Sequence, residues 1–343
     1  MRSDDGSHTD HRPNTLPTLE PCMTQPFRIR LYQMDAVVGD FDANLQKIAR
    51  AADQARADGI SMLVVPELAL TGYPPEDLLL RPALIDKLDA ANLMLQEISH
   101  DVTLCIGAPS AAPVATSDWA LGNNSARPAS LLNSLLMYRN GEHVLSYHKQ
   151  SLPNYQVFDE RRYFVAGTQS MVCDLDGLRV GLLVCEDVWV PDIVESTCRL
   201  GVDLILVLNA SPFAEGKFGE RLDHLKHRAS VNQVPIAYVN LVGGQDELIF
   251  DGGSLVVDRD GEIIAQATFF AEDQLDVVWD GQHLIGGRVE NTPSDDALLY
   301  QALVTGVRDY FSKTGFRKAV LGLSGGIDSA LTLAVAVDAL GAD

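Results

Sequence analysis

Three residues of this sequence lie at the ends of apolar runs, where a reactive side chain is useful. Cys185 follows LRVGLLV and precedes a helix that Pro191 can begin, an elbow at which helix N–H groups favour a thiolate and a developing oxyanion. Glu67 ends MLVVPE and Lys149 ends HVLSYHK, so the ammonium can pair with a carboxylate that is costly to bury alone. These residue types indicate a nucleophile at Cys185 and, at Lys149, a cation that can stabilise a thiolate or an oxyanion. The alternatives are a buried structural cysteine and two solvated strand ends.

A second chemical signal is the loop SGGIDSA, which follows the apolar run KAVLGL and opens an apolar helix. Glycines allow close approach of the backbone, and N–H groups at a helix N-terminus favour anions, so strand, loop and helix predict a phosphate-binding site. The lysine of the Walker A pattern is absent, and an ordinary glycine-containing turn is the alternative. The candidate ATP-binding residues are Ser324, Gly325, Gly326, Asp328 and Ser329.

Composition restricts the partners and the location of the protein. The 343 residues carry 26 Lys and Arg against 47 Asp and Glu, a net charge of −21 that repels nucleic acid and anionic membranes. The 5 cysteines form no CxxC pair or zinc-ligand spacing, so we assign no metal site and expect reduced thiols in the cytoplasm. No apolar stretch is long enough to predict a membrane span. Residues 1–25 are polar and proline-rich and predict a disordered leader.

The elements that must position these residues alternate between strand and helix from Phe27 onward. Helices are predicted over 42–58 and between 214 and 232, and the dipeptides Asn140-Gly141, Asp176-Gly177 and Asp260-Gly261 predict hairpins. Strands are predicted at FRIRLYQM, SMLVVPE, VTLCIGAP, SLLMYR, HVLSYHK, LRVGLLVCE, VDLILVLNA, IAYVNLV, GSLVVD and EIIAQAT. This pattern favours an α/β fold in which helices cover the outer faces of two packed sheets, an α-β-β-α sandwich.

Three motifs, in chain order, carry a resemblance to a known family. The stretches PELALTGYPPEDLL, HKQSLPNYQVFDERRYF and VCEDVW resemble the three signatures of the nitrilase, or carbon–nitrogen hydrolase, superfamily. The resemblance spans about 27–279 and implies that Glu67 is the general base, Lys149 the oxyanion-stabilising cation and Cys185 the nucleophile. It also implies a nitrilase-like sandwich.

Further stretches narrow the resemblance. LVGGQDELIFDGGSLVVD and NASPFAEGKFGER are similar to the glutaminase domain of the glutamine-dependent NAD synthetase family, and SGGIDS resembles the pyrophosphate loop of its ATP-dependent domain. By this resemblance Tyr155 and Tyr73 belong to the substrate pocket or ammonia exit, Ser211 lies near the amino-acid group of glutamine, and Glu186 follows the nucleophile. Core packing is the alternative for the two tyrosines. The run Asp159, Glu160 and Arg161 either contacts a neighbouring domain or is a solvated charge run.

The resemblance implies a complete reaction. The glutaminase hydrolyses glutamine, and its ammonia amidates nicotinic acid adenine dinucleotide to NAD with ATP and Mg²⁺ in a cytoplasmic homo-oligomer. The expected domains are a leader (1–25), a glutaminase (26–280), a linker (281–295) and the truncated start of a Rossmann-like ATP-binding domain (296–343). The alternatives are a free-standing ω-amidase, against which the SGGIDS loop argues, and a non-catalytic oligomer scaffold, against which the intact Glu67, Lys149 and Cys185 argue.

Overall fold

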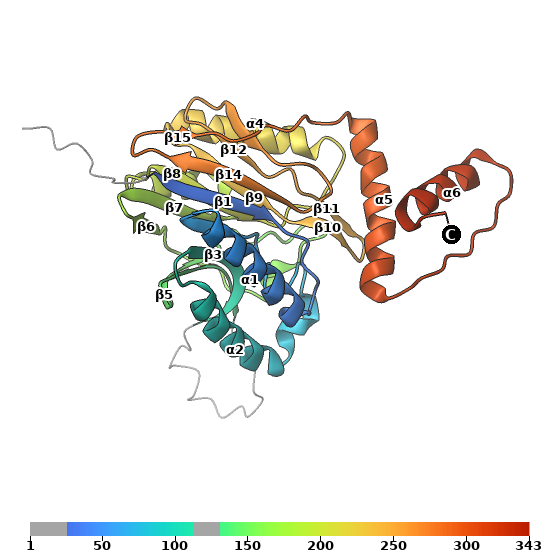
Figure 1. The fold of residues 1–343 in the computed structure, drawn as a ribbon, viewed down its shortest axis with the longest axis horizontal. Helices are drawn as coiled ribbons and strands as arrows, with labels where there is room; N and C mark the ends of the chain where they lie inside the picture. Colours follow the sequence, from blue (N-terminus) through green and yellow to red (C-terminus); the bar gives the residue numbers. More distant parts are fainter. Residues whose placement is uncertain (1–25, 113–130, 343) are drawn as a thin grey trace, which may run out of the picture.

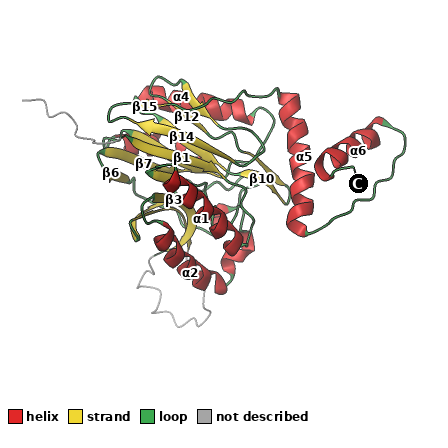
Figure 2. Ribbon diagram, viewed as in Figure 1, coloured by secondary structure: helices red, strands yellow, loops and turns green. Residues whose placement is uncertain are grey.

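The computed structural model describes residues 26–112 and 131–342, so the predicted leader, Cys22 and Asp343 lie outside the described residues. The body of the molecule consists of two β-sheets packed face to face with helices on their outer faces (Figures 1 and 2). Buried apolar side chains from both sheets, such as Ile29 and Leu206, form one continuous core between them. The predicted α-β-β-α sandwich is confirmed.

Each sheet contains parallel and antiparallel neighbours. The first sheet has, in spatial order, β15 (Leu284–Ile285), β14 (Asp273–Trp279), β1 (Phe27–Gln33), β2 (Met62–Val64), β3 (Thr103–Ala111), β4 (Leu131–Arg139) and β5 (Glu142–His148). The second has β13 (Ile263–Gln266), β12 (Leu255–Val257), β9 (Ile236–Asn240), β8 (Leu204–Asn209), β7 (Leu178–Val184) and β6 (Val172–Leu175). All residues of β8 are buried, as expected for a central strand covered on both faces.

Amphipathic helices cover the outer faces of the two sheets. Helices α1 (Phe41–Ala57) and α2 (Ala83–Ile98) lie on the first sheet, and α3 (Pro191–Cys198) and α4 (Lys217–Asn232) lie on the second. Helix α1 begins where the side chain of Asp40 accepts a hydrogen bond from the main-chain N–H of Ala43, 3.0 Å away. Short 3-10 helices occur at Glu76–Leu80, Glu160–Arg162 and Cys185–Trp189.

The three predicted hairpins are all present. Asn140-Gly141 joins β4 to β5, Asp176-Gly177 joins β6 to β7, and Asp260-Gly261 lies between β12 and β13, each pair being antiparallel. Asn140 and Asp176 have φ angles of 53° and 57°, followed by glycines at 83° and 94°. These left-handed conformations are the reason why Asn-Gly and Asp-Gly are such specific turn signals.

One prediction near the end of the chain is wrong. Residues 318–323, KAVLGL, form no strand, because a strand requires a hydrogen-bonded neighbour and no described strand lies beside this run. In the predicted linker, residues 281–295, β15 pairs with β14, and the main chain of Gln266 exchanges hydrogen bonds with that of Arg288 and Glu290. This segment therefore lies on the sandwich.

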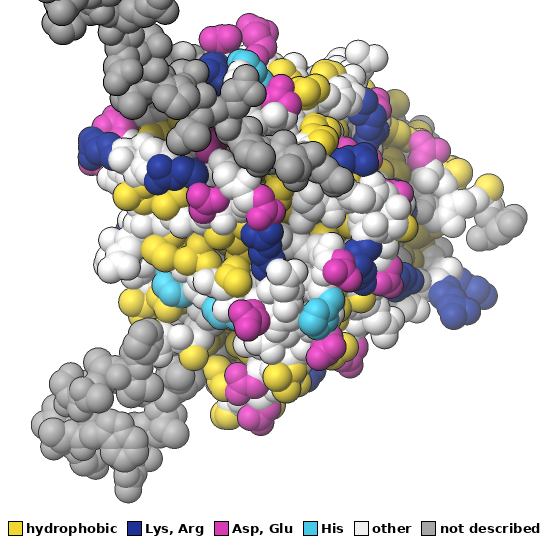
Figure 3. Space-filling model, turned by 60° about the vertical axis from the view of Figure 1, so that its left-hand side comes forward, with side chains coloured by type: hydrophobic (Ala, Val, Ile, Leu, Met, Phe, Trp, Pro, Cys, Tyr) yellow, Lys and Arg dark blue, Asp and Glu magenta, His cyan; other side chains and the backbone are white. Residues whose placement is uncertain are grey.

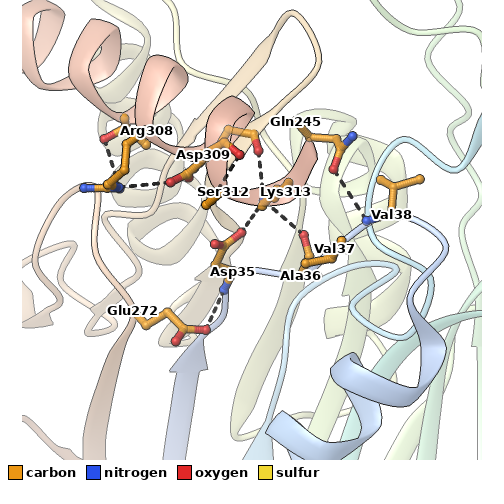
Figure 4. A network of polar contacts seen from close by, with 12 residues as sticks. Asp35, Ala36, Val37, Val38, Gln245, Glu272, Arg308, Asp309, Ser312 and Lys313 are labelled. Atoms are coloured by element: carbon orange, nitrogen blue, oxygen red, sulfur yellow. Dashed lines mark hydrogen bonds and ion pairs between the residues drawn. The ribbon is translucent and has the colours of Figure 1, made fainter. Parts of the chain in front are cut away.

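Helix α5 (Asp295–Thr314) stands against the end of the sandwich, and α6 (Ile327–Leu340) packs on its other side (Figure 1). The contact surface for α5 is a two-stranded ribbon, β10 (Val242–Gln245) and β11 (Leu248–Asp251). Figure 4 shows the polar contacts of this junction, in which Lys313 Nζ lies 2.6 Å from Asp35 Oδ1 and Asp309 accepts from the N–H of Gly244. These contacts attach α5 to the sandwich.

The surface mixes charges of both signs. On the face shown in Figure 3, Lys and Arg side chains are interspersed with Asp, Glu and hydrophobic side chains. Among the described helices, none is both long enough and apolar enough to cross a membrane.

Candidate active site

The centre of the candidate site is a lysine between two carboxylates, buried between the sheets. Lys149, directly after β5, places Nζ 2.7 Å from Glu67 Oε1 and 2.8 Å from Glu160 Oε1. The side chains of Lys149 and Glu67 have no exposed area, and that of Glu160 is 5% exposed. Burial by itself lowers the pKa of Lys149, but the charges of Glu160 and Glu67 outweigh it and raise that pKa well above its usual value. The ammonium is therefore a permanent positive charge in a dry site.

Glu67 lies in a turn three residues beyond the end of β2, and donors from both sheets hold its carboxylate. Asn133 of β4 donates its Nδ2–H to Oε1 over 2.7 Å. The main-chain N–H of Ala210, which directly follows β8, donates to Oε2 over 2.9 Å. Because one donor comes from each sheet, the orientation of this carboxylate depends on how the two sheets pack.

Cys185 occupies the predicted elbow, as the first residue after β7 and the first of the 3-10 helix Cys185–Trp189. Its φ angle of 47° is in the left-handed region, a strained conformation for a residue other than glycine that clusters at functional sites. The side chain is buried, and Glu67, Lys149 and Glu160 are near enough for their charges to shift the pKa of its thiol. The structure thus brings Cys185, Glu67 and Lys149 into one cluster.

The sequence predicts that Cys185 has thiolate character, but its surroundings in the structure favour the neutral thiol. Burial raises the pKa of the Cys185 thiol well above its usual value, and the negative charge of Glu67 raises it further, while Lys149 opposes this. The elbow alone does not ionise the thiol, because burial and the negative charges of three carboxylates outweigh the charge of one ammonium. A nucleophilic role therefore requires a base that removes the proton during the reaction.

The environment of Glu160 differs from the sequence-based prediction. The sequence places Glu160 with Asp159 and Arg161 in a run at a domain interface or in solvent, yet Glu160 is 4% exposed while its two neighbours are exposed. Burial raises the pKa of Glu160 to about 7, and the charge of Lys149 opposes this rise. The aromatic residues that flank the run, Phe158 and Phe164, were the available signal that one member faces inward.

The remaining predicted pocket residues lie at different depths. Tyr73 is buried and donates its hydroxyl to Glu160 Oε1 over 2.9 Å. Tyr155 is 50% exposed and donates its hydroxyl to Glu186 Oε2 over 3.0 Å, next to Cys185. Ser211 is buried on the second sheet's side, where its Oγ accepts from Arg221 Nη2 over 3.3 Å.

A cavity of about 200 Å³ lies beside Glu160, on the edge of the polar cluster. Its walls come from residues 73–79 and 157–164, and they include the hydrogen-bonded pair Tyr73 and Glu160. The cavity therefore meets the polar cluster at the side of Glu160.

The SGGIDS loop is separate from this cluster, because α6 lies across α5 from the sandwich (Figure 1). The loop is exposed and leads directly into α6. Ser324 Oγ lies 3.1 Å from Ser329 Oγ, and Gly325 has a φ angle of 87° with open space around its Cα. The two hydroxyls and the uncovered glycine backbone fit a phosphate group.

Comparison with known proteins identifies a family that matches most of the chain. Residues 28–280 match the model of the family described as carbon-nitrogen hydrolase. The chain belongs to the carbon–nitrogen hydrolase family. Beyond the carbon–nitrogen hydrolase domain, residues 299–343 match the NAD synthase model.

Individual relatives agree with both matches. The chain is 38% identical over 319 residues to the glutamine-dependent NAD(+) synthetase of Acinetobacter baylyi, covering 92% of this chain and 56% of the relative. The solved glutamine-dependent NAD+ synthetase of Acinetobacter baumannii, in complex with ADP, has a TM-score of 0.86 and 39% identity, covering 93% of this chain and 58% of that one. The chain thus spans somewhat more than half the length of these relatives.

A solved amidase structure is also similar to this chain. A variant of the amidase from Nesterenkonia sp. AN1 has a TM-score of 0.64 and 29% identity, covering 74% of this chain and 89% of that one. Its structure shows covalent addition of the acetamide moiety of fluoroacetamide at its active-site cysteine.

Proposed function

We propose that this chain is the glutamine-hydrolysing part of a glutamine-dependent NAD(+) synthetase, an amidotransferase and ligase. Residues 26–280 are its glutaminase domain, and 296–343 belong to its ATP-binding domain. The observation that carries the proposal is the buried Lys149 between Glu67 and Glu160 beside Cys185, within a carbon–nitrogen hydrolase domain. The similarity to named synthetases along most of the chain supports the substrate.

In the proposed reaction Glu67 takes the proton of the Cys185 thiol, and the thiolate attacks the side-chain amide carbon of glutamine. Negative charge develops on the amide oxygen, where Lys149 stabilises it in a site closed to bulk solvent. Glu67 returns its proton to the departing nitrogen as the C–N bond breaks, which releases ammonia and leaves a thioester. Glu67 then takes a proton from a water molecule, and the hydroxide attacks the thioester. Glu67 returns this proton to the sulfur as the C–S bond breaks, so that glutamate is released and the Cys185 thiol is restored.

The other predicted residues would bind the substrate. Tyr155 and Glu186, hydrogen-bonded at the exposed side of Cys185, would meet the amino-acid end of glutamine as it enters. Ser211 would contribute from the second sheet, and Tyr73 would contact the product side through Glu160. The raised pKa of Tyr155, about 12 owing to burial and then to the charge of Glu186, keeps its hydroxyl a donor.

The ammonia would serve the ATP-dependent step. Ser324, Gly325, Gly326, Asp328 and Ser329 would hold ATP phosphate groups by hydroxyl and main-chain donors at the start of α6. ATP would activate nicotinic acid adenine dinucleotide, and ammonia would displace AMP to form NAD. Among the described residues no group of three or more His, Cys, Asp or Glu side chains is arranged to hold a metal ion, so we assign no residue to Mg²⁺. The proposed cytoplasmic location rests on the cysteine content, and the proposed homo-oligomeric assembly rests on the family resemblance.

The test is release of glutamate from glutamine by the purified chain, followed beside a panel of other ω-amides. We expect glutamine to be the preferred substrate and Cys185→Ala to abolish its hydrolysis. A clear preference for another amide would replace the glutaminase with an ω-amidase. If the chain hydrolyses no amide in a thiol-dependent reaction, the interpretation as a non-catalytic scaffold remains.

A further inference from the structure

Asp187 lies two residues after Cys185 and is completely buried, yet the proposed reaction gives it no role. Its carboxylate accepts four hydrogen bonds. Oδ1 accepts from the main-chain N–H groups of Gln150, at 3.0 Å, and Ser151, at 2.7 Å. Oδ2 accepts from the hydroxyl of Tyr147, at 2.8 Å, and the main-chain N–H of Val184, at 3.1 Å.

These donors flank the two reactive residues. Tyr147, Gln150 and Ser151 lie on both sides of Lys149, whereas Val184 directly precedes Cys185. Strand β5, which leads to Lys149, belongs to the first sheet, and β7, which leads to Cys185, belongs to the second. One side chain therefore ties together the ends of two strands that no ladder of main-chain hydrogen bonds joins.

The four bonds require an ionised carboxylate. Burial raises the pKa of Asp187 to about 6, while the N–H of Ser151, the hydroxyl of Tyr147, the charge of Lys149 and the N–H of Val184 oppose the rise. At neutral pH the group is therefore an acceptor at both oxygens. An amide of the same shape has one acceptor oxygen, so it leaves the donors at its nitrogen without a partner.

We propose that Asp187 is a positioning residue that sets the distance between Lys149 and Cys185 by holding the main chain beside both of them. The role rests on the proposed glutaminase function. Asp187 acts through its neighbours and not on the substrate, since its two oxygens are already occupied by protein donors. Loss of the carboxylate should move the ammonium relative to the thiol and reduce stabilisation of the oxyanion, with little change in how glutamine binds.

The principal test is Asp187→Asn, with Asp192→Asn, an exposed carboxylate in the first turn of α3, as the matched control. Active sites are counted by complete reaction with a diazo-ketone analogue of glutamine, and kcat is expressed per reactive site. We expect kcat to fall roughly 10- to 100-fold while KM stays within about 2-fold, because small misplacement of a catalytic group can cost about 100-fold. The control should match the unmodified protein.

A purely structural role predicts a different pattern. Fewer sites would then react and the melting temperature would fall, but kcat per reactive site would be unchanged, and that result would overturn the proposal. If Asp187→Asn does not fold, Tyr147→Phe decides, since it removes one of the four donors. It should lower kcat per site by about 3- to 10-fold, and an unchanged value would overturn the proposal. An unmodified protein without glutaminase activity would instead count against the proposed function.

Discussion

Two lysines of this protein lie among carboxylates, one inside the sandwich and one at its edge. Lys149 contacts Glu67 and Glu160 with no exposed side-chain area. Lys313 of α5 contacts Asp35 and the main-chain oxygen of Gly244, at 2.8 Å, with 12% of its side chain exposed and 25% of that of Asp35 (Figure 4). The distances are alike, but Lys149 pairs with two carboxylates and Lys313 with one, and the two sites lie at different depths.

Depth changes what an ion pair does. Around Lys149 the surroundings exclude water, so its charge acts strongly on Glu67, Glu160 and Cys185, and any unpaired member is costly. Around Lys313 the pair is reached by solvent, which screens the attraction and makes the contact an attachment of α5 to the β10–β11 ribbon. This difference supports the proposed catalytic role of Lys149, whereas Lys313 attaches α5 to the sandwich.

The largest expected effect concerns the thiol inside the buried site. Cys185→Ala should lower glutamate release by about 10⁴-fold or more, because removing a nucleophile leaves only binding and electrostatic contributions. The fold should persist, since the side chain lost is small. Cys198→Ala, at the end of α3, is the matched control and should keep full activity. Substantial glutamate release by Cys185→Ala would show that the buried site does not catalyse the reaction.

The direct comparison of the two lysines is next in size. Lys149→Met should lower the free energy of unfolding by about 3–5 kcal/mol, because it leaves two buried carboxylates unpaired, and should lower activity almost as much as Cys185→Ala. Lys313→Met should cost about 1 kcal/mol and leave glutamate release unchanged. Urea unfolding and an activity assay measure both. Equal costs for the two changes would show that depth does not separate them.

A smaller effect should distinguish the buried site by its response to pH. The pKa of Glu160 is raised in the folded protein from 4.5 to about 7. Such a group favours folding below its unfolded pKa, and this contribution is lost as pH rises through the folded pKa. Between about pH 4.5 and 7 the unmodified protein should therefore lose about 1–3 kcal/mol relative to Glu160→Gln. Urea unfolding across this range provides the measurement, with Asp159→Asn as an exposed control, and parallel curves would contradict the expectation.

The smallest effect should come from the exposed rim. Tyr155→Phe removes the hydroxyl that contacts Glu186, a bond accessible to solvent and worth about 1 kcal/mol or less. We expect KM for glutamine to rise by about 2- to 5-fold with kcat nearly unchanged, as for a group that contributes equally to substrate and transition-state binding. Steady-state kinetics decide this, and a large loss of kcat would move Tyr155 into the reacting centre.

Much of the fold followed from local patterns. The Asn140-Gly141 and Asp176-Gly177 turns were found because left-handed backbone is a property of a few adjacent residues. The positions of Lys149 and Cys185 at strand ends were equally readable from apolar runs that stop at a polar residue. By contrast, KAVLGL has the composition of a strand and is not one, because pairing requires a partner elsewhere in the chain.

By itself, the sequence determined the sandwich and the elbow at Cys185. It also supplied Glu67, Lys149 and Cys185, which the family resemblance groups into one catalytic site. The tertiary structure alone decided which charges share a site: it placed Glu160 against Lys149, and it joined Asp187 to the hydroxyl of Tyr147 on one side of that lysine and to the main-chain N–H of Gln150 on the other. It also reversed the expected ionisation of the Cys185 thiol. The physical reason is that turns and amphipathic patterns depend on neighbours in the chain, whereas burial, pairing and pKa depend on groups brought together from distant segments.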